Sequence, residues 1–94
     1  LIGSDPYDLS SVYEYCQKKD FAKMRQWVAT ALSISDTTNV FHAIEKEFSK
    51  RLDDKYVPNL IVSLAEYQAK VPFSANQEIA LTAFLVEIMQ NCFD

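Results

Sequence analysis

Residues 79–93 read Ile-Ala-Leu-Thr-Ala-Phe-Leu-Val-Glu-Ile-Met-Gln-Asn-Cys-Phe, and this stretch decides the fold. It contains neither glycine nor proline, so no residue in it interrupts a helix. On a helical wheel its polar positions gather on one side, and most of the remaining circumference is apolar. These polar positions are Glu87, Gln90 and Asn91, and Asp94, directly after the stretch, falls on the same side. A helix that is apolar over so much of its surface must be covered from several directions, which predicts the central helix of an all-α domain.

The segment 74–94 reaches the length of a membrane span, which takes about 20 residues. Glu87 and Gln90 lie inside it, and no basic residues flank it. Membrane spans are depleted of internal charge and are anchored by flanking Lys or Arg. We therefore expect a helix buried in protein and no membrane partner.

The composition favours one helical domain over residues 1–94. The chain has 94 residues, of which 49% are apolar, with one glycine and three prolines. This composition indicates helices joined by short turns, and the length suits a single compact bundle of five helices with the apolar C-terminal helix at its centre. The net charge of −4 disfavours nucleic acid binding through bulk charge. Because the chain begins at Leu1 without a signal peptide, we expect a C-terminal piece of a longer protein.

Each of the five predicted helices begins at residues suited to a helix start. In chain order the predicted starts are Asp5 with Pro6 (alternatively a capping box of Ser11 and Glu14), Asp20, Asp36, Val57 with Pro58, and a capping box of Ser74 and Gln77. Apolar residues recur at helical spacing after each of the first four starts. The predicted core positions in these helices are Leu9, Val12, Tyr13, Cys16, Phe21, Met24, Val28, Ala31, Leu32, Val40, Phe41, Ile44, Phe48, Leu52, Val57, Leu60, Ile61, Leu64, Tyr67 and Val71.

Residues that carry enzyme chemistry do not form a recognisable set. Gly3 is the only glycine, whereas nucleotide-binding loops need several. His42, the only histidine, lies off the apolar stripe of its helix and has no assignable nucleophile or carboxylate partner. Cys16 and Cys92 both occupy apolar positions, so we expect buried thiols instead of a disulfide or a metal site. We therefore predict no catalytic, cofactor-binding or metal-binding residue and no cofactor.

Several residues lie at the edge of the predicted core and are candidates for contact with a partner. Trp27 lies about 80° from the middle of its apolar face, so it either laps over the rim of the core or anchors a partner. Val62 projects almost opposite the core side of its helix. The complete set of predicted interface residues is Tyr15, Trp27, Val62, Glu87, Gln90 and Phe93.

Two parts of the chain carry a resemblance to a known family. One is the run Val-Tyr-Glu-Tyr-Cys-Gln-Lys-Lys-Asp-Phe-Ala-Lys-Met-Arg at 12–25. The other joins Pro58, Ile61 and Leu64 to Asn-Gln-Glu at 76–78, which opens the long apolar helix. Together they resemble the C-terminal domain of the ATPase subunit of T4-type bacteriophage clamp loaders, over nearly the whole chain, although no single run is diagnostic.

The resemblance implies a role in DNA replication. Clamp loaders are five-subunit AAA+ machines of the replication factor C type that load a ring-shaped sliding clamp onto primed DNA, and their C-terminal domains pack side by side as a helical collar. It implies that this domain contacts other clamp loader subunits in a pentameric ring, in the cytoplasm of a host cell. The clamp and DNA would be bound through upstream ATPase modules that this chain lacks. Without a Walker loop, the domain itself is expected neither to bind nor to hydrolyse ATP.

Two other interpretations remain open from the sequence. The first is a stand-alone helical adaptor that binds an amphipathic peptide in a groove beside the last helix. The second is a small nucleic-acid-binding domain that uses the cations near the first interhelical turn, although the net negative charge of the chain disfavours this interpretation. These cations are Lys18, Lys19, Lys23 and Arg25.

Overall fold

The structure is a computed structural model that describes residues 8–73 and 75–93. Within these ranges the chain is helical and contains no strand, so the predicted all-α fold of five helices is confirmed. Single turns of 3-10 helix, Asp54–Tyr56 and Val71–Phe73, flank the fourth helix. The α-helices are α1 (Leu9–Gln17), α2 (Phe21–Ile34), α3 (Thr37–Arg51), α4 (Val57–Lys70) and α5 (Gln77–Asn91).

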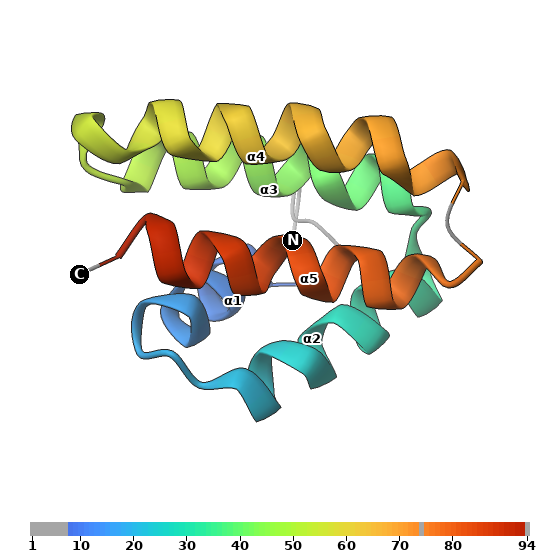
Figure 1. Ribbon diagram of the computed structural model, residues 1–94. Helices are drawn as coiled ribbons and strands as arrows, with labels where there is room; N and C mark the ends of the chain where they lie inside the picture. Colours follow the sequence, from blue (N-terminus) through green and yellow to red (C-terminus); the bar gives the residue numbers. More distant parts are fainter. Residues whose placement is uncertain (1–7, 74, 94) are drawn as a thin grey trace, which may run out of the picture.

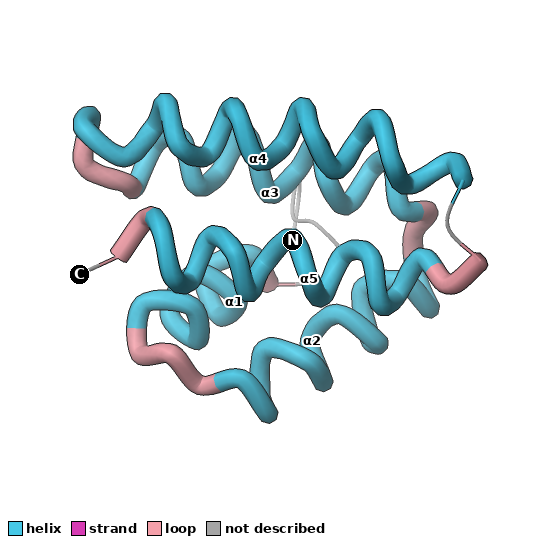
Figure 2. Tube along the Cα trace, in the orientation of Figure 1, coloured by secondary structure: helices cyan, strands magenta, loops and turns pink. Residues whose placement is uncertain are grey.

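The C-terminal helix lies between two pairs of helices. In Figure 1, α3 and α4 form one layer above α5, and α1 and α2 form the other layer below it. Figure 2 shows the short loops that join consecutive helices. All four other helices pack against α5, as the wide apolar surface of this helix requires. The predicted central position of the last helix is confirmed.

Side-chain caps explain where four of the helices begin. Asp20 and Asp36 accept hydrogen bonds from the backbone N–H three residues later, which confirms both predicted caps. The first helix is capped by Asp8, whose carboxylate accepts from the N–H groups of Ser10 and Ser11. The last helix is capped by Asn76, which accepts from the N–H of Ile79.

Two predicted starts are therefore corrected. The alternative start at Ser11 and Glu14 is wrong because Asp8 lies nearer the chain start and already caps α1. The predicted capping box of the last helix is replaced by the Asn76 cap, and the side chain of Gln77 instead accepts a hydrogen bond from the hydroxyl of Thr37. Asp5, Pro6 and Ser74 lie outside the described residues. Val57 with Pro58 does open α4, as predicted.

The turn between α1 and α2 places a lysine in an unusual backbone conformation. Lys19 has a φ of 59°, in the left-handed region that glycine usually occupies. Its N–H donates to the carbonyl of Cys16, and the N–H of Asp20 donates to the carbonyl of Tyr15. This pair of bonds is the Schellman motif that ends helices. The chain thus reverses after α1 at the expense of local strain in a residue with a β-carbon.

The core agrees with most of the apolar pattern. Its largest fully buried side chains include Phe41, Phe48 and Phe84, and the rings of Phe41 and Phe84 lie 4.9 Å apart. Phe21 and Ile61 were predicted to be core residues, but they are 46% and 44% exposed, because each lies at the edge of its helix's buried face. The two errors have one cause, since periodicity gives the direction of a buried stripe more accurately than its width.

Candidate functional site

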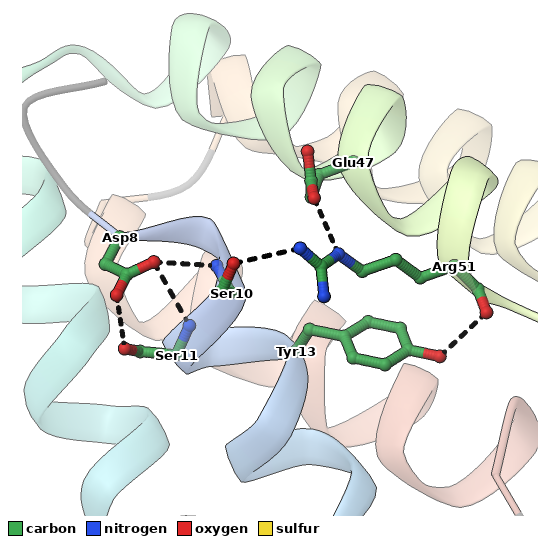
Figure 3. Close-up of polar contacts among 6 residues, drawn as sticks. All are labelled: Asp8, Ser10, Ser11, Tyr13, Glu47 and Arg51. Atoms are coloured by element: carbon green, nitrogen blue, oxygen red, sulfur yellow. Dashed lines mark hydrogen bonds and ion pairs between the residues drawn. The ribbon is translucent and has the colours of Figure 1, made fainter. Parts of the chain in front are cut away.

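A network of polar contacts among described residues joins α1 to the end of α3 (Figure 3). Arg51 pairs with Glu47 through Nε and Oε2 at 2.6 Å, and its Nη2 donates to the hydroxyl of Ser10 at 2.9 Å. The guanidinium also lies 5.6 Å from the ring centre of Tyr13, whose hydroxyl donates to the backbone carbonyl of Arg51 at 3.1 Å. Desolvation by burial raises the pKa of Tyr13. Glu47 and Arg51 stand four residues apart on α3, so both side chains lie on the same face of the helix.

An open cavity of about 350 Å³ adjoins this junction. Its lining combines three aromatic rings with polar side chains. The rings are Tyr13, Tyr56 and Phe93, and the charged lining residues are Arg51 and Asp53. The ring of Phe93 meets Tyr13 edge-on at 5.3 Å between centroids, and Lys55 lies over the ring of Tyr56 at 5.0 Å. Arg51 lies over the ring of Tyr13 and Lys55 over the ring of Tyr56, so both rings already have a cation of the same chain as a partner.

A second hollow lies between α4 and α5, with a volume of about 320 Å³. Its lining residues are Asn59, Val62, Ser63 and Asn91. The amide of Asn59 donates to the backbone carbonyl of Asn91 at 3.1 Å, which ties the start of α4 to the end of α5. We call this hollow the α4–α5 groove.

Glu87 of α5 lies beside the α4–α5 groove and accepts a hydrogen bond from the hydroxyl of Ser63. The pKa of Tyr67, also on α4, is raised chiefly by desolvation and next by the charge of Glu87. Glu87 is half-buried and its described partners are neutral. The groove therefore combines an exposed aliphatic side chain, two amides and a carboxylate, a set suited to contact with protein.

The predicted interface residues do not form one surface. Val62 lines the groove, Glu87 lies beside it, and Gln90 is exposed on the same helix as Glu87. Tyr15 is half-buried against the core on the other side of the fold, and Phe93 packs on Tyr13. The structure thus brings part of the predicted set together, around α4 and α5.

Trp27 requires a correction. Its side chain is buried, with 8% exposed, and belongs to the core cluster. The indole N–H donates to the backbone carbonyl of Asp8 at 2.8 Å, immediately before α1. The prediction of a boundary residue is wrong because Asp8, the N-cap of α1, meets the edge of α2, a contact that a helical wheel of α2 alone does not include.

Other sequence predictions have the following outcomes. Cys16 and Cys92 are free, buried thiols, as expected. Burial raises the pKa of Cys16 to about 12 and that of Cys92 to about 11. His42 is exposed on α3, also as expected. In the part of the chain that the structure describes, no group of three or more His, Cys, Asp or Glu could hold a metal ion, and no helix is both long and apolar enough to cross a bilayer.

Comparison of the chain with family models, curated proteins and solved structures gives no match. The resemblance to clamp loader subunits therefore stays a prediction from the residues quoted above.

Proposed function

We propose that this chain is an assembly domain that binds neighbouring protein subunits, of the kind that forms the collar of a DNA-replication clamp loader. The observation that carries the proposal is that several large apolar side chains are exposed to solvent and lie outside the hydrophobic core. Phe73 is 89% exposed, Val62 68% and Ile79 56%. Exposed apolar side chains that cluster mark interaction surfaces more often than single ones do.

These side chains lie in two regions, which suits a subunit with a neighbour on either side. Ile61 and Val62 project from α4. Phe73 ends the turn after α4 and Ile79 lies in the first turn of α5, and in Figure 1 these two segments meet at one end of the bundle. A subunit in a ring uses two different faces, because each neighbour contacts it head-to-tail. In this proposal the parent protein works in the cytoplasm, and its ATPase modules contact the clamp and DNA.

A variant with a charge on the exposed face of α4 tests the proposal. Val62→Asp should abolish concentration-dependent association and change the free energy of unfolding by less than about 0.5 kcal/mol, because the side chain is largely exposed. Ala29→Asp, at an exposed position of α2, is the control. Equal association of the wild type and Val62→Asp in light scattering would refute the role of α4.

The α4–α5 groove favours a second candidate, a stand-alone adaptor that binds an amphipathic peptide helix. An adaptor would remain monomeric at concentrations where an assembly domain associates. The same light-scattering series therefore separates the two candidates.

A further inference from the structure

Glu87 is a half-buried carboxylate that forms no ion pair with a cation among the described residues. Among the described residues, ion pairs join Lys18 to Glu14 and Arg51 to Glu47, and neither involves Glu87. Its hydrogen-bond donor is the neutral hydroxyl of Ser63, a lining residue of the α4–α5 groove. Removing a charge from water is unfavourable unless a counter-charge compensates it. A Lys or Arg that entered the groove from outside the chain would supply that counter-charge.

The chain carries a matching basic segment elsewhere. Residues 18–25 contain four of the nine basic residues and one of the 13 acidic ones, a net charge of +3, so the rest of the chain carries −7. We call this segment the basic turn. Its cations Lys19, Lys23 and Arg25 are exposed and form no ion pair with other described residues, and Phe21 among them is 46% exposed. The segment thus offers cations and an aromatic ring to a partner.

The groove and the basic turn lie on different sides of α5. In Figure 1, α4 lies above α5, whereas the turn from α1 to α2 lies below it. One copy therefore presents the α4–α5 groove, with Glu87 beside it, on one side of α5 and the basic turn on the other. Surfaces that differ and complement each other associate head-to-tail, and the contact can repeat from copy to copy.

We propose that the α4–α5 groove of one copy binds the basic turn of a second copy, with Glu87 paired to a cation of residues 18–25. This inference rests on the assembly role proposed above and names the two surfaces that meet: the groove on the α4 side of one copy and the basic turn of the next. Phe73 and Ile79, at the other exposed apolar region, take no part in this contact. Opposite charges on the two surfaces set the orientation of the contact and make it sensitive to salt. Val62 and Phe21 supply apolar area beside the ion pair.

Two variants that each disable one surface test the contact. Glu87→Gln removes the charge and keeps an oxygen that accepts from Ser63. The triple variant Lys19→Gly, Lys23→Gln and Arg25→Gln disables the basic turn. Each should raise the dissociation constant for self-association by about tenfold or more in sedimentation velocity. A mixture of the two should form a one-to-one dimer and nothing larger, because only one intact groove and one intact turn can meet.

The control is Glu66→Gln, which changes the net charge by the same amount as Glu87→Gln but at an exposed position of α4. If Glu87→Gln associates as strongly as Glu66→Gln, or if the mixture forms no dimer, the groove does not bind the basic turn. When the wild type still associates in that case, the assembly role stands and only this contact is refuted. A wild type that stays monomeric throughout overturns both.

Discussion

Replacing Lys19 by glycine should stabilise the domain. At a φ of 59° the β-carbon of Lys19 is crowded against the following carbonyl, which disfavours this conformation by about 1–2 kcal/mol. Glycine relieves that strain but adds freedom to the unfolded chain, which offsets roughly 0.4–1 kcal/mol. The expected net gain is about 0.5–1 kcal/mol. For a domain of this size it raises the melting temperature by roughly 2–8 °C.

Urea denaturation followed by circular dichroism measures this gain. Lys19→Ala is the first control, since it removes the charge and keeps the β-carbon, and it should give no stabilisation. Lys18→Gly is the second control, because Lys18 has a right-handed φ of −86° and ψ of −4°. There glycine relieves no strain, adds freedom to the unfolded chain and removes the exposed pair with Glu14. Lys18→Gly should therefore lower stability.

The reasoning is refuted if Lys19→Gly is no more stable than the wild type, or if Lys19→Ala gains as much. The first result would mean that the turn relaxes without strain. The second would mean that charge repulsion within the basic turn, and not the backbone, limits stability.

Three further predictions follow from buried or capping groups. Trp27→Ala should lower the free energy of unfolding by about 3–5 kcal/mol in urea titrations, and a loss below 1 kcal/mol would contradict the burial of the ring. Cys16 and Cys92 should resist an aromatic disulfide reagent at pH 8 until the chain unfolds, and rapid labelling of the folded protein would contradict their burial. Because the folded thiols keep their protons above the usual pKa of 9.0, the free energy of unfolding should also fall as the pH rises from about 9 towards 11. The pKa of Asp8 lies below 3.8, chiefly because the Ser11 hydroxyl donates a hydrogen bond to its carboxylate. Asp8→Ala should therefore lower the free energy of unfolding by about 1 kcal/mol at neutral pH, and by less once the pH falls below 3.8. A loss that does not depend on pH would contradict the cap.

The amino-acid sequence predicts the helices of this fold because local rules determine them. Asp20 and Asp36 cap helices as expected, and Pro58 opens one. The start of α1 is harder to predict, because several residues near Asp8 could also cap a helix and only the folded chain selects among them. Apolar spacing likewise predicts the central position of α5, since its surface demands cover on several sides.

Residues whose surroundings come from distant segments were harder to predict. Trp27 lies in the core and donates a hydrogen bond to the backbone carbonyl of Asp8, 19 positions earlier in the chain. Ser63, the hydrogen-bond donor to Glu87, lies on α4, so the half-buried state of this carboxylate does not follow from the pattern of α5. The signal available in the sequence is that Glu87 is the single charged residue in the largely apolar run 79–93.

Sedimentation equilibrium of the wild-type chain, from micromolar to millimolar concentration, tests the assembly role most directly. The proposal predicts reversible association beyond a dimer, because each copy offers two different surfaces and every bound copy leaves one open. Association should also weaken as salt is added, since opposite charges meet at the contact. A monomer at every concentration, or a dimer that no excess of protein enlarges, would contradict it.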